Sequence, residues 1–341
     1  MLCRVAENLF WLSRYLERAV AVVRLIDVMG HLELDAGDLD DRTVAFWVPL
    51  LDPQRPGAFA SPALGPSSTP DQIRYHLVFD PEHQNSVVSC IRQSRAAARE
   101  VRESISSEMW ERLNSLYLSL LDSHLVRLAD EDSHAFFRHV LMDAVLVQGL
   151  ADDTLAHDEP WQFVSLGRYL ERADNTARLL SLESHLLGGG DPLSGDNMVR
   201  WLAVLRSCGS AEAYARYYSL RVEPARIVEF LLLNPVFPQS VRFAIAAARD
   251  AMGFIARAEG TEAAAPARAL GQLQARLEHV AVDEVFEEGL ERYLADVRRR
   301  VYGVSDLVSR DHFRNDPEPV RQAAATRAAE IMAAQQQQQQ Q

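Results

Sequence analysis

The hexamer "RYLERA" occurs twice in this chain, at residues 14–19 and 168–173. When the copies are aligned on the hexamer, further identities extend over several helical turns: Leu12 with Leu166, Arg24 with Arg178, Leu25 with Leu179 and His31 with His185. Leucine, alanine, arginine and glutamate favour helix, and the apolar residues follow a helical period. The repeat therefore predicts two equivalent helices related by a pseudo-two-fold axis.

Helical periodicity also dominates the rest of the chain, and almost no stretch alternates as a half-buried strand does. We predict an all-α fold, a multi-helix bundle, with motif helices near 4–34 and 158–187 and a single domain over 1–312. Three interruptions are predicted: a mobile Pro-, Ser- and Gly-rich loop at 52–70, a hinge at 188–196 and a low-complexity, disordered tail at 313–341.

All 35 basic residues are arginine, and the chain contains no lysine. Without lysine there is neither a Walker A phosphate loop nor Schiff-base chemistry, so we expect no cofactor. The formal net charge of -13 argues against nucleic-acid binding, which needs positive charge to displace counterions. Three scattered cysteines indicate a reducing compartment. No stretch is long and apolar enough for a membrane span, and we expect a cytoplasmic protein without a membrane partner.

Each copy of the repeat carries a charged stripe with members seven residues apart: Glu17, Arg24 and His31 in the first copy, and Glu171, Arg178 and His185 in the second. Residues seven apart lie roughly 10 Å apart along a helix. The stripes therefore need partners from other helices. Two interpretations are open: an ion network that fixes two halves of the bundle, and a polar pocket for an anionic or zwitterionic ligand. No metal site is expected, because a di-metal bundle needs a Glu-x-x-His pair on each of two helices.

The two copies differ around the stripe. In the second, Asp174 and Asn175 lie near Arg178, whereas apolar residues surround the first stripe. We expect the N-terminal helix to be buried on nearly all sides with its charges paired to other helices, because unpaired buried charge is costly. The second copy should present a face that water reaches, and we expect any ligand contact there. Locally, Arg14 and Arg168 can each pair with the glutamate three residues on.

Four arginines follow at spacings of three, four and three on one predicted helix: Arg92, Arg95, Arg99 and Arg102. Like charges at such spacing destabilise an isolated helix, so something acidic should face them. An acidic surface of the same protein is one candidate. Recognition of a phosphate or carboxylate is the other, and the forked guanidinium suits it.

A histidine lies at the junction "QGLADDTLAHDEPW" before the second motif helix. Asp153 and His157 are four residues apart and can hydrogen-bond, as an acid–base imidazole requires. Together with Asp152 and Asp158, His157 is a candidate catalytic residue. Capping of the following helix is the structural alternative. No nucleophile elbow, HExxH motif or glycine-rich phosphate loop accompanies this junction, so catalysis is left open.

Six segments in co-linear order carry a family resemblance: "RVAENLFWLSRYLERA", "FDPEHQNSVVSCIRQSR", "SSEMWERLN", "QGLADDTLAHDEPWQFVSLGRYLERADNTARLL", "LRSCGSAEAYARYY" and "VEFLLLNPVFPQSVRFAI". The chain is similar to the alpha-E domain family, a bacterial all-helical family of unknown function named for its Glu-Arg motif. The similarity runs from Met1 to about Arg310. By matching position, the resemblance points to these residues: Glu17, Arg18, Arg95, Arg99, Asp152, His157, Asp158, Glu171, Arg172, Asp174, Asn175 and Arg178.

The resemblance implies an association rather than a known reaction. Its implied partners are a circularly permuted ATP-grasp amidoligase and a transglutaminase-like or proteasome-like protease of the same gene cluster. Our leading hypothesis is a helical accessory or substrate-handling subunit that holds a peptide-like or anionic small ligand for such a ligase. Two alternatives stay open: a stand-alone enzyme of amide or peptide chemistry that uses His157 with Asp152 or Asp153, and a purely structural scaffold.

Overall fold

The computed structural model describes residues 1–36, 64, 68–122, 129, 131–184, 195–218, 221–260 and 264–313. Over these residues it contains helices and no strand, so the predicted all-α class is confirmed. His185 lies outside the described residues, as do nearly all of the predicted loop, hinge and tail at 52–70, 188–196 and 313–341. No helix within the described ranges has both the length and the apolar character that crossing a membrane requires.

The helices follow in chain order as α1 (Cys3–Ala36), α3 (Pro70–Val78), α4 (Val87–Glu100), α5 (Ser107–Ser119), α7 (Ser133–Thr154), α8 (Glu159–Glu183), α9 (Gly195–Ser207), α10 (Ala211–Tyr218), α11 (Pro224–Val228), α12 (Val241–Glu259), α13 (Ala265–His279), α14 (Val282–Glu288) and α15 (Leu290–Val308). Shorter turns are η1 (Arg102–Ser104), η3 (Glu229–Leu233) and η4 (Ser309–Phe313). The two RYLERA segments thus lie on α1 and α8, the longest helices described.

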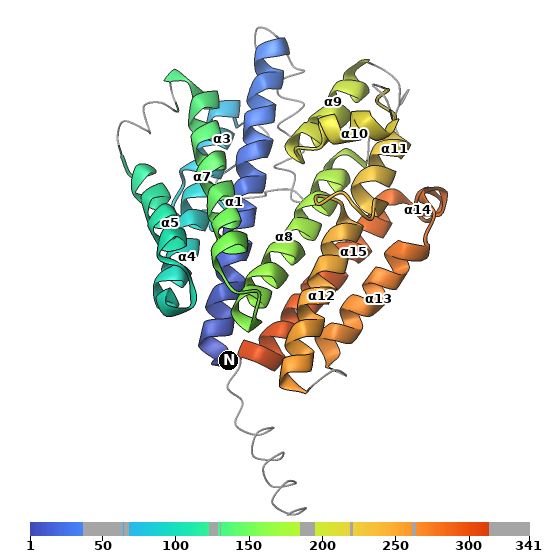
Figure 1. Cartoon of the computed structure of the whole chain (residues 1–341). Helices are drawn as coiled ribbons and strands as arrows, with labels where there is room; N and C mark the ends of the chain where they lie inside the picture. The colour runs from blue at the N-terminus through green and yellow to red at the C-terminus, as the bar shows by residue number, and fades with distance from the viewer. Residues whose placement is uncertain are drawn as a thin grey trace, which may run out of the picture.

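Helices α1 and α8 pack against each other at the centre of the molecule. Helices α3, α4, α5 and α7 lie on the α1 side, and α9 to α15 lie on the α8 side (Figure 1). Phe10 meets Gly167, and farther along α1 Glu17 meets Arg172, so the two motif helices run in the same direction. This packing brings the two copies of the repeat together.

The motif helices approach most closely at Gly167. A Cβ atom there would lie 2.3 Å from the carbonyl oxygen of Phe10 and 2.4 Å from Ser13 Oγ. Glycine inside a helix costs about 1 kcal/mol relative to alanine, so its presence here reflects the space that the crossing allows. Ser13 is the residue aligned with Gly167 in the first copy, and it is also small. Small residues at both aligned positions let the two backbones meet.

The face of α8 that was expected to be wet is buried. Glu171 is 0% and Asp174 1% exposed, because α1, α12 and α15 all pack against α8. The predicted contrast between a buried first copy and a hydrated second copy is therefore wrong. A sequence pattern of polar residues does not distinguish a hydrated face from one whose polar groups bind one another.

Candidate functional site

The Glu-Arg dipeptides of the two RYLERA segments bind each other reciprocally. Arg172 donates from Nε and Nη2 to the two carboxylate oxygens of Glu17, at 2.7 and 3.1 Å. In the same way, Arg18 donates from Nε and Nη2 to Glu171, at 2.6 and 3.0 Å. Paired donors on a planar guanidinium match a carboxylate well. The charged residues of one motif helix thus find their main partners on the other.

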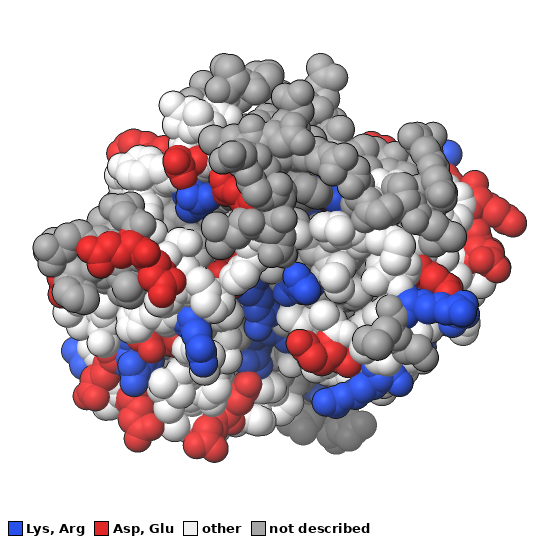
Figure 2. Space-filling view, turned by 90° about the horizontal axis from the view of Figure 1, so that it is seen from above, with Lys and Arg blue, Asp and Glu red and all other residues white. Residues whose placement is uncertain are grey.

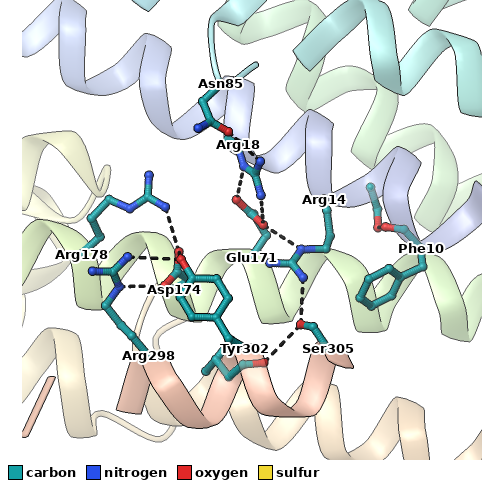
Figure 3. A network of polar contacts seen from close by, with 12 residues as sticks. Phe10, Arg14, Arg18, Asn85, Glu171, Asp174, Arg178, Arg298, Tyr302 and Ser305 are labelled. Carbon is teal, nitrogen blue, oxygen red and sulfur yellow. Dashed lines mark hydrogen bonds and ion pairs between the residues drawn. The ribbon is translucent and has the colours of Figure 1, made fainter. Parts of the chain in front are cut away.

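Further helices complete the bonds around Glu171 (Figure 3). Arg14 donates from Nε to Glu171 at 2.8 Å and from Nη1 to Ser305 Oγ of α15 at 2.8 Å. Arg18 also donates to Asn85 Oδ1 at 2.8 Å, just before α4. The local pairing of Arg14 with Glu17 that the spacing allowed is replaced by a pairing between helices. The carboxylate that Arg14 binds is fully buried, and a hydrogen bond is stronger in such a region of low polarity.

Both motif glutamates stay ionised despite their burial. Burial opposes ionisation of Glu171, but Arg18 and Arg14 outweigh it and lower its pKa to about 2. The pKa of Glu17 is lowered in the same way, since Arg172 outweighs the effect of burial. Gln148 of α7 also donates to Glu17 Oε2 at 2.7 Å. The network is a buried set of satisfied charges, as the structural interpretation requires.

These pKa shifts predict that acid weakens the fold. A carboxyl group whose pKa is lower in the folded state stabilises the protein above its unfolded pKa, and this contribution is lost as the pH falls through the folded pKa. For Glu171 the contribution is about 3 kcal/mol, and we expect it to disappear between about pH 5 and pH 2. Urea unfolding of the full chain at stepped pH measures it. An unchanged free energy of unfolding from pH 7 to pH 3 would contradict the prediction.

A second buried carboxylate joins α8 to α15. Asp174 accepts from Arg178 Nη2 at 2.9 Å, from Arg298 Nε at 2.8 Å and from Tyr302 OH at 3.0 Å (Figure 3). Burial opposes ionisation, but Arg178 and Arg298 outweigh it, so the pKa of Asp174 is lowered. The spacing that favoured a pair between Asp174 and Arg178 is confirmed. Neighbouring Asn175 is buried as well, and its Nδ2 has no hydrogen-bond partner in the described part of the chain.

Arg24 departs from this pattern. Its guanidinium packs at the turn between α9 and α10, where a Cβ atom on Gly209 would lie 3.5 Å from Arg24 Cζ. No carboxylate of the described residues forms an ion pair with it, although pairing of every buried charge on α1 was expected. Burial lowers the pKa of Arg24; Glu17 opposes this shift, and the charge of Arg172 adds to it. Since Glu17 is already bound by Arg172, Arg24 is left as a partly buried cation beside a completed pair.

His31, the third member of the first stripe, does not join the network. It lies near the exposed end of α1 beside Asp27 and His134, with its Nδ1 2.8 Å from the backbone oxygen of Asp27. Arg168 also pairs differently from the expectation: both of its Nη atoms donate to Asp152, each at 2.8 Å, rather than to Glu171. Arg168 thus binds a carboxylate of α7 instead of the glutamate on its own helix.

Two members of the predicted arginine stripe, Arg95 and Arg102, face aromatic rings of α5, whereas Arg92 and Arg99 have other partners. Helix α4 ends at Glu100, so Arg102 lies beyond it in η1. The contacts are as follows: Arg92 donates to Pro81 O at 3.1 Å; Arg95 donates to Asn114 Oδ1 at 2.7 Å and lies 4.7 Å from the centroid of Tyr117; Arg99 pairs with Glu100 at 3.6 Å; Arg102 lies 4.8 Å from the centroid of Trp110. A guanidinium stacks on aromatic faces, which explains how α5 accommodates the stripe without an acidic surface.

The junction at His157 has no acid–base geometry. His157 is exposed, its ring stacks on Trp161 at a centroid distance of 3.9 Å, and its Nε2 lies 3.1 Å from the backbone oxygen of Asp152. In the described residues no hydrogen bond joins it to Asp153. Asp158 occupies the N-cap position of α8, as the sequence context predicted, although its side chain forms no capping bond. The Asp152 carboxylate is bound by Arg168, so it does not orient the His157 imidazole as acid–base catalysis would require.

Several partners in these networks carried no sequence signal. They come from three segments: Asn85 before α4, Gln148 on α7, and Arg298, Tyr302 and Ser305 on α15. None is at a helical spacing from the residue that it binds. Each motif glutamate has an arginine three residues before it and another directly after it, which marked it as a candidate for ion pairing but did not indicate its partner helix.

Basic side chains gather at the middle of one end of the molecule. Figure 2 shows them in a hollow between the two halves, bordered by uncharged and acidic residues. This is the end toward which α1 runs (Figure 1), and Arg24 lies two helical turns beyond Glu17 in that direction. The motif pairs and Arg24 therefore follow one another from the core toward this face.

A family model for Alpha-E, described as a predicted alpha-helical domain with a conserved ER motif, matches residues 1–313. The chain belongs to the Alpha-E family. Both ER dipeptides of the RYLERA segments lie in the matched region, and in this Alpha-E protein they form the reciprocal pairs described above. The family description assigns no activity.

Uncharacterised mycobacterial proteins are similar to this Alpha-E chain. A Mycobacterium bovis protein and proteins from two strains of Mycobacterium tuberculosis are each 23% identical to it over 314 residues. The aligned region covers 86% of this chain and 34% of each relative, so the chain spans about a third of the length of the curated relatives it matches. No solved structure matches the Alpha-E chain.

Proposed function

We propose that this Alpha-E protein is a helical accessory subunit that holds an anionic, peptide-like substrate for a separate ATP-grasp amidoligase. The observation that carries the proposal is Arg24, a partly buried guanidinium without a carboxylate partner in the described residues. Leaving a buried charge unpaired is costly. A carboxylate or phosphate of a ligand supplies the missing partner.

The neighbours of Arg24 determine which charged group of a ligand can bind beside it. Glu17 and Glu171 are occupied by arginines, so neither is free to receive the ammonium group of a substrate. Arg172 adds positive potential beside Arg24 while its own donors are held by Glu17. The site therefore favours an anion, and a guanidinium binds a carboxylate through two parallel hydrogen bonds. Basic side chains also gather between the two halves at this end of the molecule (Figure 2), which favours the approach of an anionic ligand.

The accessory role rests on chemistry that this chain lacks. It has no lysine and no glycine-rich phosphate loop, so a partner must supply the activation of a carboxylate by ATP. The resemblance to proteins associated with ATP-grasp amidoligases names that partner. The greater length of the curated relatives is consistent with a further domain joined to the Alpha-E region in those proteins.

Arg24→Met tests the ligand site. We expect N-acetylglutamate or a glutamate-ended dipeptide to bind the full chain, and the variant to lose at least about tenfold in affinity, which corresponds to about 1.4 kcal/mol. The variant should be no less stable than the natural chain, because it removes an unpaired cation from the interior. Isothermal titration and thermal melting measure the two effects.

Arg216→Met is the matched control, since Arg216 is exposed on α10 and its variant should bind the same probes as the natural chain does. Inorganic phosphate is a third probe that distinguishes a carboxylate site from a general anion site. If none of these anions binds the natural chain, or if both variants bind them equally, the ligand site is refuted.

The accessory role has its own test. A circularly permuted ATP-grasp amidoligase is assayed for ADP release with a carboxylate peptide and an amine, with and without this chain. We expect the natural chain to stimulate ADP release and the Arg24→Met variant to stimulate it several-fold less while still forming the complex. A ligase that works equally well without this chain would refute the accessory role, whatever the result of the binding experiment.

A further inference from the structure

Three metal-ligating side chains meet at the outer end of α1, apart from the motif network. Asp27 and His31 lie four residues apart on α1, and His134 is the second residue of α7. One ligand atom from each lies within 4.8 Å of the others. Asp27 Oδ1 is 2.9 Å from His134 Nδ1 and 3.8 Å from His31 Nδ1. We propose that these three residues form a binding site for a transition-metal dication of the Zn²⁺ type.

The donor set selects the class of metal. Two imidazole nitrogens and one carboxylate oxygen suit Zn²⁺ and its transition-metal relatives, whereas Mg²⁺ and Ca²⁺ prefer oxygen ligands alone. At metal–ligand distances of about 2.0–2.1 Å, tetrahedral ligand atoms lie roughly 3.3 Å apart. Two of the present separations, 2.9 and 3.8 Å, bracket that value. With three protein ligands, a fourth position stays open for water or a ligand.

The side chains are free to complete this geometry. His31 is 47% and His134 53% exposed, and their rings meet edge to face at a centroid distance of 4.8 Å. Asp27, whose side chain is 23% exposed, is now the partner of both rings: its carboxylate lies 2.9 Å from His134 Nδ1, and its backbone oxygen lies 2.8 Å from His31 Nδ1. An incoming cation takes over that role, and rotation of the two exposed imidazoles closes the third separation without movement of the helices.

The site would join two helices that are far apart in the sequence. Asp27 and His31 come from the last turns of α1, and His134 comes from the first turn of α7, so one ion would clamp the end of α1 to its neighbour. An ion bound by Asp27 and the two exposed imidazoles would stabilise the folded chain by mass action whenever the ion is present. This proposal differs from the sequence expectation of no metal, and it does not depend on a ligand at Arg24.

Cobalt titration tests the proposal. The full chain, prepared without a polyhistidine tag and treated with chelator, is titrated with Co²⁺ while its visible absorption is recorded. We expect one ion per chain with the intense spectrum of tetrahedral nitrogen and oxygen coordination, displaced by Zn²⁺ but not by Mg²⁺. Zn²⁺ should also raise the melting temperature.

Variants distinguish this site from adventitious binding. His134→Ala and His31→Ala should each lower the affinity for Co²⁺ at least about tenfold, because each removes one of three ligands. His139→Ala is the matched control, which changes an exposed histidine on the same helix as His134, and it should bind as the natural chain does. Equal Co²⁺ affinity in all three variants, or a natural chain with only the weak spectrum of hydrated Co²⁺, would overturn the proposal.

Discussion

Replacing Glu171 by glutamine is expected to lower the free energy of unfolding by about 3–5 kcal/mol, the usual cost of removing one partner from a buried ion pair. Glu171 is 0% exposed and receives charged hydrogen bonds from both Arg14 and Arg18. Glutamine keeps the shape but not the charge, so two guanidiniums lose their neutralising carboxylate. Urea unfolding at pH 7 measures the loss.

The chain provides a close control for this substitution. Glu291 and Arg292 form another Glu-Arg dipeptide, on the exposed face of α15. Glu291→Gln should change the free energy of unfolding by less than about 0.5 kcal/mol, as exposed substitutions usually do. The free energy of unfolding of the Glu171→Gln variant should also fall less on acidification than that of the natural chain, because the variant lacks the carboxylate that becomes protonated. Equal stability of the two variants would show that the buried pairs do not hold the motif helices together.

Replacing Gly167 by alanine is expected to destabilise the fold by about 3 kcal/mol, at the upper end of the usual range for overpacking. The added Cβ would lie 2.3 Å from Phe10 O and 2.4 Å from Ser13 Oγ. The serine hydroxyl can rotate away, but the carbonyl belongs to the α1 backbone. The two motif helices must therefore separate, which lengthens the reciprocal Glu-Arg bonds farther along them. Thermal and urea unfolding measure the change.

Gly149→Ala is the opposite case. Gly149 lies in the interior of α7, and a Cβ atom added to it would have nothing within 4 Å, so alanine there should stabilise the chain by up to about 1 kcal/mol. The two glycine variants therefore have opposite expected signs although the chemical change is the same. A Gly167→Ala variant as stable as the natural chain would mean that α1 and α8 do not cross as closely as described.

The sequence was sufficient for the fold class and for the motif helices. Their apolar residues and helix-forming composition act within a few turns, and α1 and α8 begin and end within a few residues of the predicted positions. The sequence was a less reliable guide to which side chains are buried. The polar residues around Asp174 suggested a wet face, because the arginine and tyrosine that bind this carboxylate come from α15, more than a hundred residues later.

The candidate sites show the same limit. Spacing alone predicted the pair between Asp174 and Arg178, since both residues are on one helix. Spacing also allowed Arg14 and Arg168 to pair with glutamates on their own helices, but both bind residues elsewhere. The sequence did not indicate that Arg24 would be the member of its stripe without a carboxylate partner. That outcome depends on a tertiary contact, in which Arg172 binds Glu17.

The sequence by itself determined that the chain is all-helical, that two of its helices carry the same Glu-Arg motif, and that the motif charges need partners from other helices. These properties follow from local propensity, periodicity and the reach of side chains along one helix. Only the tertiary structure decided which charges meet. It placed the two motifs against each other, left Arg24 beside a completed pair and brought His134 to Asp27, because such contacts depend on the packing of segments that are distant in sequence.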